Sequence, residues 1–223
     1  MKSSDHRYIL AIVGNGACPV GSAEQIDSAT RVARFGDAAG LGGFAGNRVD
    51  DLTVVNRGVV AKDLLEDEQA LARQAIRAAR RIILPLDRHS IFLAPSGGPR
   101  VVKTPSASKE LDYSNELRSR LRSSCRAVTS IDASMHEQAC RELGLSIGSR
   151  ARERADYHLP SGAFIALYWY VQGLPKNWLI ELYGCEHGID SASAANLQEL
   201  AWIRRMEQTG RVAVLPAISD RAA

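Results

Sequence analysis

Short apolar segments alternate with longer amphipathic segments along the 223 residues of the chain. The first apolar run, Tyr8 to Val13 (YILAIV), is closed by glycine and is typical of a buried strand. Similar runs, bounded by Gly, Pro, Asn or Asp, recur to the end of the chain. The sequence therefore predicts strands at 8–13, 30–35, 52–56, 81–84, 91–94, 127–131, 178–183 and 211–215.

Between these runs, apolar residues recur about every 3.6 residues, which predicts helices. Ser134 and Glu137 have the spacing of a capping box, and Gly144 would end the helix that they open. Strands that alternate with helices predict an α/β fold: a Rossmann-like sheet with helices on both faces, in a single domain over 1–223. The helices are expected at 61–80, 109–122, 134–144, 163–171 and 193–208.

Two segments lack either pattern and are predicted to be loops. The stretch 40–48 (GLGGFAGNR) holds four glycines in nine residues, and 87–108 is rich in Pro, Ser and Gly. The second is the expected place of a lid or acceptor loop. Only about ten residues, Pro19 among them, separate the first glycine turn from the second strand, which leaves poor room for the usual crossover helix of a βαβ unit.

Composition narrows the class of protein. An apolar fraction of 45% with 24% charged residues is typical of a globular chain. A net charge of +3 allows a phosphorylated ligand or contact with an anionic membrane surface, and it does not imply nucleic acid. Cys18, Cys125, Cys140 and Cys185 form no CxxC pair, so we expect free thiols and no metal site. With no signal segment or apolar span, the sequence predicts a cytoplasmic protein.

The turn Gly14-Asn15-Gly16 after the first strand is the first candidate site. Ligands of open α/β sheets bind outside the carboxyl ends of strands, and glycines let backbone amides reach a phosphate or a ribose. A plain turn is an equally good interpretation of the three residues. Gly14, Gly16 and Asp37 also match part of a dinucleotide fingerprint, which leaves a nicotinamide-dependent oxidoreductase as a weaker alternative.

Ser161 is the second candidate, because it opens the apolar helix predicted at 163–171. A hydroxyl and unpaired amides at the positive end of a helix form an anion site, although Ser161 is also what an ordinary N-cap requires. Glu186-His187, just past the strand 178–183, is the third. His187 could act as general base, with Glu199 on the following helix orienting it or binding the acceptor.

Three blocks of the sequence resemble the sialylmotifs of the sialyltransferases. The large motif orders a VGN turn, an I-D-S/D step, an R-F-N strand end and a G-x-x-T/R-D element. The segment 159–188 resembles the small motif, P-S-T-G before an apolar helix and a strand ending Y-G-F, and 199–215 resembles the tail carrying an HxxxxE, with Glu199 as its glutamate. The large-motif elements here are Val13-Gly14-Asn15, Ile26-Asp27-Ser28, Arg34-Phe35-Gly36 and Gly46-Asn47-Arg48-Val49-Asp50.

The resemblance implies a GT-A-like sialyltransferase variant of the Rossmann-like fold, no metal or other cofactor, and a CMP-activated sialic acid or Kdo as donor. It implies that Asn15 contacts the donor phosphate or ribose, and that Ser161 and Gly162 bind the nucleotide or the sugar carboxylate. It also implies an essential histidine that deprotonates the acceptor hydroxyl. Ala194 stands where that histidine belongs, five residues before Glu199.

These observations leave two main interpretations of function. The first is a metal-independent glycosyltransferase that moves an acidic sugar from CMP to a glycan or lipid-linked acceptor, with His187 as the base. The second is a catalytically inactive or accessory nucleotide-binding protein on the same fold, which Ala194 favours.

Overall fold

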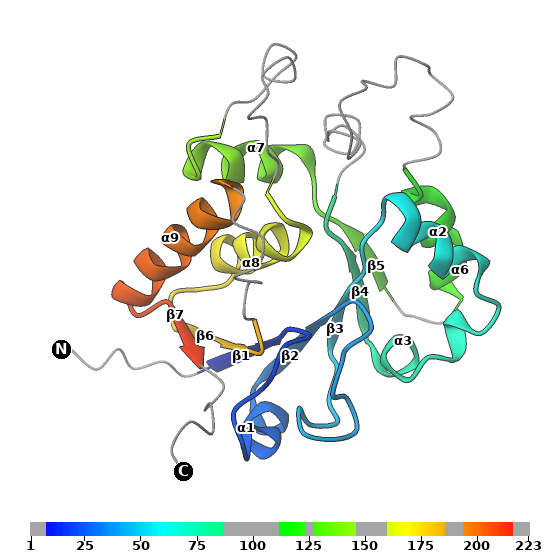
Figure 1. The fold of residues 1–223 in the computed structure, drawn as a ribbon, viewed down its shortest axis with the longest axis horizontal. Coiled ribbons are helices and arrows are strands. Elements are labelled where there is room, and N and C mark those ends of the chain that lie inside the picture. Colours follow the sequence, from blue (N-terminus) through cyan, green and yellow to red (C-terminus); the bar gives the residue numbers. More distant parts are fainter. Residues whose placement is uncertain (1–7, 87–111, 124–126, 146–159, 186–193, 216–223) are drawn as a thin grey trace.

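The computed structural model describes residues 8–86, 112–123, 127–145, 160–185 and 194–215. Within these residues, seven parallel strands form one sheet in the order β5-β4-β3-β2-β1-β6-β7 (Figure 1). All-parallel pairing requires crossover connections, which is why helices alternate with the strands. The strands are β1 (Tyr8–Val13), β2 (Arg31–Phe35), β3 (Asp51–Thr53), β4 (Arg81–Leu84), β5 (Ala127–Ser130), β6 (Trp178–Tyr183) and β7 (Val212–Leu215).

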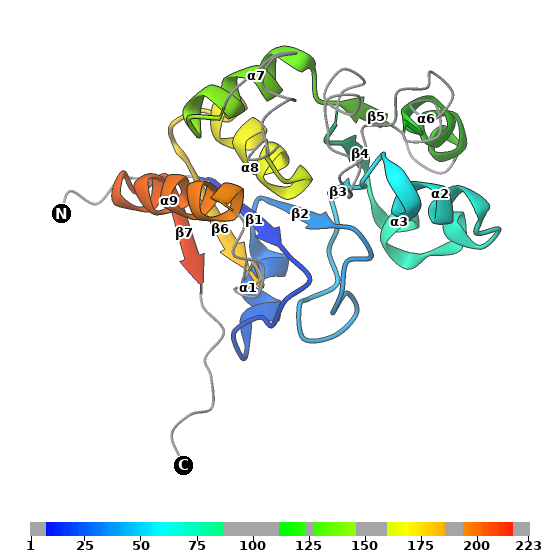
Figure 2. The same cartoon turned by 45° about the horizontal axis from the view of Figure 1, so that its top comes forward.

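Helices cover both faces of the sheet, as the sequence predicts. One face carries α7, α8 and α9, and the other carries α1 near β1 and β2 and the group α2, α3 and α6 near β3 to β5 (Figures 1 and 2). The helices are α1 (Ser22–Ser28), α2 (Gly58–Glu66), the 3-10 turn η1 (Ala70–Ala72), α3 (Gln74–Ala78), α6 (Ser114–Arg122), α7 (Ala133–Glu142), α8 (Gly162–Gly173) and α9 (Ala194–Gln208).

Successive side chains of each strand point to opposite faces of the sheet, so apolar clusters form on both faces. Leu10 and Ile12 of β1 pack with α8 and with Trp202 of α9. Ala11 and Val13 pack on the opposite face with Ile26 of α1. Helix α8 is apolar nearly all round, because it is covered by the sheet on one side and by α7 and α9 on the others.

The order of the strands reverses at β1, which pairs with β2 on one side and with β6 on the other. In open α/β sheets this switch point marks the ligand crevice, at the carboxyl ends of the strands. The segments that follow β1 and β6 meet there, and α8 and α9 begin at the same edge (Figure 1).

The opposite, amino edge of the sheet is held by a buried ion network. Asp51, the first residue of β3, is 1% exposed and accepts two hydrogen bonds from Arg81, at 3.0 and 2.7 Å. The hydroxyl of Tyr170 in α8 donates to the same carboxylate at 2.6 Å, and Arg31 pairs with it at 3.2 Å. Burial and the nearby carboxylate raise the pKa of Tyr170 well above its usual value, so the hydroxyl remains a donor.

The first crossover does contain a helix, although the connection leaves poor room for one. Residues Ser22–Ser28 form α1, a seven-residue helix. Gly21 enters it with a left-handed backbone, φ 80°, and the buried side chain of Ile26 anchors the helix to the sheet. Two turns suffice for this crossover because α1 does not need to run the full length of the strands.

The helix predicted over 61–80 is broken into α2, η1 and α3. Asp67 ends α2, and its carboxylate accepts from the backbone N–H of Gln69 at 2.9 Å and from Arg73 at 2.8 Å. A short polar side chain that bonds to the backbone two residues on favours a turn over a continuing helix. Because the apolar residues keep their helical spacing across this turn, the sequence pattern predicts one continuous helix.

The remaining boundaries differ by a few residues. Strand β3 ends at Thr53 instead of residue 56, and α6 begins at Ser114 instead of residue 109. Helix α7 is capped by Asp132, whose carboxylate accepts from the N–H of Met135 at 2.9 Å, so the predicted capping box at Ser134 is wrong. The predicted strand 91–94 and loop 87–108 lie outside the described residues.

Candidate functional site

The glycine turn after β1 packs against the glycine turn after β6. The N–H of Gly14 donates to the carbonyl of Tyr183 at 2.8 Å, and the N–H of Gly16 donates to the carbonyl of Gly184 at 2.9 Å. A Cβ on Gly16 would lie 2.7 Å from the carbonyl oxygen of Gly184, and one on Gly14 would collide with the same oxygen. The close approach of the two backbones therefore explains why both positions are glycine. Their N–H groups already donate to carbonyl groups of the protein.

Asn15 sits between these glycines and is exposed. Its Oδ1 accepts from the N–H of Ala39 at 3.2 Å, so the loop after β2 fixes the orientation of the carboxamide. A Cβ on Gly36 would lie 3.4 Å from Nδ2 of Asn15, in ordinary contact. The exposed carboxamide, held at the end of β1 next to the switch point, is the polar group of this turn best placed to meet a ligand.

Ser161 and Glu199 form a close polar pair at this edge. The N–H of Ser161 donates to Oε1 of Glu199 at 2.6 Å, and its hydroxyl donates to Oε2 at 2.9 Å. The same hydroxyl accepts from the N–H of Phe164 at 3.0 Å, which confirms Ser161 as the N-cap of α8. The structure thus joins two candidate residues that lie 38 apart in the sequence and that no sequence pattern links.

The carboxylate of Glu199 occupies the position at the start of α8 where an anion would bind. Glu199 is 1% exposed, and its carboxylate lies at the positive end of the helix dipole. A buried carboxylate so bound holds α9 to the first turn of α8. Ser161 therefore has a structural partner where the sequence suggested an external anion.

Gly162 and His136 extend the site to the end of β4. A Cβ on Gly162 would lie 3.2 Å from Cγ of Pro85, so glycine lets the start of α8 pack closely on that residue. Nε2 of His136, a buried residue of α7, lies 2.6 Å from the carbonyl oxygen of Pro85. Pro85 thereby connects the first turns of two helices at the carboxyl edge.

His187 and Glu186 lie outside the described residues, so their relation to this edge stays a prediction. Helix α9 begins at Ala194, the position where the resemblance expects a histidine, and Glu199 lies one and a half turns further on.

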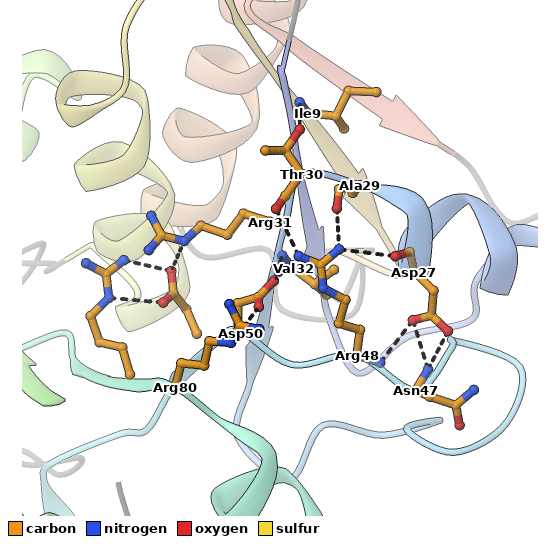
Figure 3. Close-up of polar contacts among 12 residues, drawn as sticks. Ile9, Asp27, Ala29, Thr30, Arg31, Val32, Asn47, Arg48, Asp50 and Arg80 are labelled. Carbon is orange, nitrogen blue, oxygen red and sulfur yellow. Dashed lines mark hydrogen bonds and ion pairs between the residues drawn. The ribbon is translucent and has the colours of Figure 1, made fainter. Parts of the chain in front are cut away.

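The large-motif elements form a structural clamp beside α1 (Figure 3). The carboxylate of Asp27 accepts from the N–H groups of Asn47 and Arg48 at 2.9 Å each. The guanidinium of Arg48 in turn donates to the carbonyl of Asp27 at 3.1 Å and pairs with Asp50 at 2.8 Å. Gly46 has φ 79°, and a Cβ there would lie 2.6 Å from Oδ1 of Asp27. These residues fix the glycine-rich loop after β2.

Arg34 lies fully buried under the same loop. Its Nε donates to the carbonyl of Arg48 at 2.9 Å, and NH2 donates to the carbonyl of Ala45. Burial lowers the pKa of Arg34, while the charge of the Asp27 carboxylate acts in the opposite direction. The guanidinium therefore supports the loop from inside the fold.

Asp37, on which the oxidoreductase alternative rests, pairs with Arg73 at 2.7 Å. The first crossover helix is also short, with seven residues. An acid already engaged by an arginine is poorly placed to bind a ribose hydroxyl, so the geometry disfavours that alternative.

The thiols of the described residues are free, as expected for Cys18, Cys140 and Cys185. Burial raises the pKa of Cys140 to about 11 and that of Cys185 to about 12, so both remain protonated near neutral pH. In the described ranges, no group of three or more His, Cys, Asp or Glu is arranged to hold a metal ion. The helices of those ranges are also too short or too polar to cross a membrane.

Sequence reasoning missed two residues at the carboxyl edge, Asn56 and Arg57. Asn56 is fully buried, and Nδ2 donates to the carbonyl of Leu86 at 2.7 Å and to the hydroxyl of Ser114 at 2.6 Å. The signal was present, because an asparagine that follows an apolar strand marks the end of that strand. The predicted strand 52–56 extends over this residue.

The fold is that of the sialyltransferases. Two structures of a mammalian sialyltransferase, one in complex with Gal-beta-1-3GalNAc-ortho-nitrophenol, each superpose with a TM-score of 0.51 over 94% of this chain, at 14% sequence identity. The superposition covers 70% of the chain in the complex and 69% in the other structure. At this identity the likeness shows the shared fold and carries no statement about activity.

At the level of sequence, the chain is similar to the urease operon 23 kDa accessory protein of Rhizobium meliloti (strain 1021), with 38% identity over 74 residues. The similar segment spans 33% of this chain and 34% of that protein. No family model matches the sequence.

Proposed function

We propose that the protein binds a CMP-activated acidic sugar at the carboxyl edge of its sheet and transfers the sugar to a glycan or lipid-linked acceptor. The observation that carries the proposal is the Ser161–Glu199 pair, which joins the segments resembling the small motif and the tail motif on a sialyltransferase-like fold. The exposed Asn15, fixed by Ala39 at the switch point, supports a nucleotide site next to that pair.

Within this proposal Glu199 is a positioning residue. A carboxylate that is 1% exposed and hydrogen-bonded to Ser161 holds the start of α8 in place. With 1% of its surface exposed, the side chain offers almost no access to an acceptor hydroxyl. We therefore assign proton abstraction to His187, which follows the end of β6 in the sequence.

A transfer assay tests the catalytic part of the proposal. The wild type is incubated with CMP-sialic acid or CMP-Kdo and a panel of glycan acceptors, and released CMP is measured. His187→Ala should lower the turnover at least about 100-fold, as expected for loss of a general base, and His6→Ala serves as the matched control. Equal turnover in the wild type and His187→Ala would remove His187 from the mechanism.

An accessory protein that binds a nucleotide without transfer is the second candidate. It is favoured by the similarity to a urease operon accessory protein and by Ala194 at the histidine position. The two candidates differ in turnover alone: CMP binding with no release of CMP from any CMP-sugar would support the accessory role.

A further inference from the structure

Arg57 occupies the carboxyl edge of the sheet between β3 and α2. It directly precedes Gly58, the first residue of α2, with an extended backbone at φ −140° and ψ 160°. The residue before it, Asn56, is fully buried and anchors the segment to the end of β4 through Leu86. The backbone of Arg57 therefore belongs to the rigid rim of the proposed site.

A second strand-like contact fixes Arg57 from the other side. Arg57 forms an antiparallel bridge with Asp112, and the N–H of Tyr113 donates to the carbonyl of Asn56 at 3.2 Å. The hydroxyl of Ser114 accepts from Asn56 at 2.6 Å. Hydrogen bonds thus link segments 56–57 and 112–114, and they hold the backbone of Arg57 in place.

The charge of Arg57 has no partner in the described part of the chain. Its side chain is partly buried, and this burial lowers its pKa; among the described residues no ion pair offsets the effect. Other arginines of these ranges do contact acceptors: Arg48 pairs with Asp50, and Arg81 pairs with Asp51. A guanidinium that loses water without gaining an acceptor is destabilised, and an incoming anion would restore the lost interactions.

Contacts through Pro85 and Leu86 connect the Arg57 segment to the start of α8, next to Ser161. Asn56 bonds to Leu86, and Pro85, the residue before it, packs on Gly162 at the start of α8. The start of α8 already holds the carboxylate of Glu199, so a second carboxylate would be repelled there. At this edge, Arg57 offers a partly buried guanidinium that has no ion-pair partner among the described residues.

Resting on the proposed function, we propose that Arg57 determines specificity for the acidic sugar by binding its carboxylate. A guanidinium presents two parallel N–H donors in the geometry of a carboxylate, which distinguishes an acidic sugar from a neutral one. The nucleotide would bind nearer to Asn15 and β1. The sequence offered no motif for this residue, because a single arginine after a strand has no characteristic spacing.

Calorimetric titration tests this assignment with probes that separate sugar from nucleotide. Wild type, Arg57→Gln and the control Arg80→Gln are titrated with CMP, CMP-sialic acid, free sialic acid and its methyl ester. Arg80 is a fair control, because its exposed guanidinium lies at the amino edge and pairs with Asp50 at 3.6 Å. Circular dichroism melts of each variant verify that the fold is retained.

We expect Arg57→Gln to weaken binding of CMP-sialic acid by about tenfold or more and to leave CMP binding within about twofold. In the wild type the methyl ester should bind more weakly than the acid, and in Arg57→Gln this difference should vanish. Arg80→Gln should match the wild type for every probe.

The other outcomes separate the two proposals. Equal weakening of CMP and CMP-sialic acid, or no preference for acid over ester in the wild type, would overturn the assignment of Arg57 and leave the nucleotide site standing. Arg57-dependent binding of free sialic acid without CMP binding would support Arg57 and contradict the CMP-sugar site. Binding of none of the probes would overturn both.

Discussion

Ser161 and Glu199 are joined by two hydrogen bonds, of 2.6 Å from the backbone N–H and 2.9 Å from the hydroxyl of the serine. The first places a carboxylate on the last amide before α8, and the second leaves the hydroxyl free to accept from Phe164. One buried glutamate therefore completes a helix cap and binds α9 to α8. Because both helices start at the carboxyl edge, this contact shapes the candidate site without requiring a ligand.

Removing the carboxylate should destabilise the protein measurably. Glu199→Ala leaves a buried N–H and a hydroxyl without their acceptor, which costs about 2–3 kcal/mol in the free energy of unfolding. Ser161→Ala should cost about 1 kcal/mol as a lost cap, and the double variant should cost less than the sum. Urea denaturation measures all three. Glu137→Gln on the surface of α7 is the control and should change the free energy of unfolding by less than about 0.5 kcal/mol.

Substitution of Gly184 should be worse than substitution of a glycine with open space around it. Gly184 has φ 56°, and its Cβ would lie 2.6 Å from the carbonyl oxygen of Gly16, whereas Gly144 has φ 68° and nothing within 4 Å. Both alanine variants carry the left-handed strain of about 1 kcal/mol, and Gly184→Ala adds a backbone clash of about 1–3 kcal/mol. Thermal melts that give equal losses for the two would argue against the close approach of the two turns.

The Asp51 network at the amino edge should contribute strongly to stability. Tyr170→Phe removes a 2.6 Å hydrogen bond to the buried carboxylate and should cost about 1–3 kcal/mol. Asp51→Ala leaves Arg81 partly buried without its partner and should cost about 3–5 kcal/mol. Tyr168→Phe, on the same helix, is the control for loss of a hydroxyl. Chemical denaturation showing no difference between Tyr170→Phe and Tyr168→Phe would contradict the role of this network.

Alkylation should report the raised pKa values of Cys140 and Cys185. With pKa values of about 11 and 12, both thiols are protonated at pH 8 and should react with iodoacetamide far more slowly than in urea-unfolded protein. Because the folded state holds these protons above the ordinary thiol pKa, their contribution to stability is complete at pH 7. It should decline as the pH rises from about 9 through the folded values. Mass spectrometry of modified peptides gives the rates, and fast labelling of Cys185 in the folded protein at pH 8 would contradict its burial.

The fold follows closely from the sequence because its strands are short apolar runs with glycine or proline at their ends. β1, β4 and β6 fall at the predicted residues, and α8 begins beside the predicted cap at Ser161. The sequence pattern did not predict the helix boundaries at which a single side chain determines the local backbone conformation. Asp67 divides a continuous amphipathic pattern, and Asp132 caps α7 in place of Ser134.

The candidate site was predictable in its parts and not in their relation. Ser161 and Glu199 were each recognised, but no spacing rule links residues on two helices that pack side by side. The role of Gly14 and Gly16 was also ambiguous, because a glycine turn that approaches a ligand and one that approaches Gly184 have the same sequence. Arg57 has no sequence signal, since its lack of an ion-pair partner among the described residues is a property of the packed structure alone.

The most direct test of the central claim is calorimetric titration with CMP, with UMP and NAD as controls, because it requires no knowledge of the acceptor. Our account predicts binding of CMP that exceeds binding of UMP and NAD and weakens in Asn15→Ala. Absence of CMP binding, or equal binding of all three nucleotides, would contradict a CMP-sugar site at the carboxyl edge and leave the likeness to sialyltransferases as one of fold.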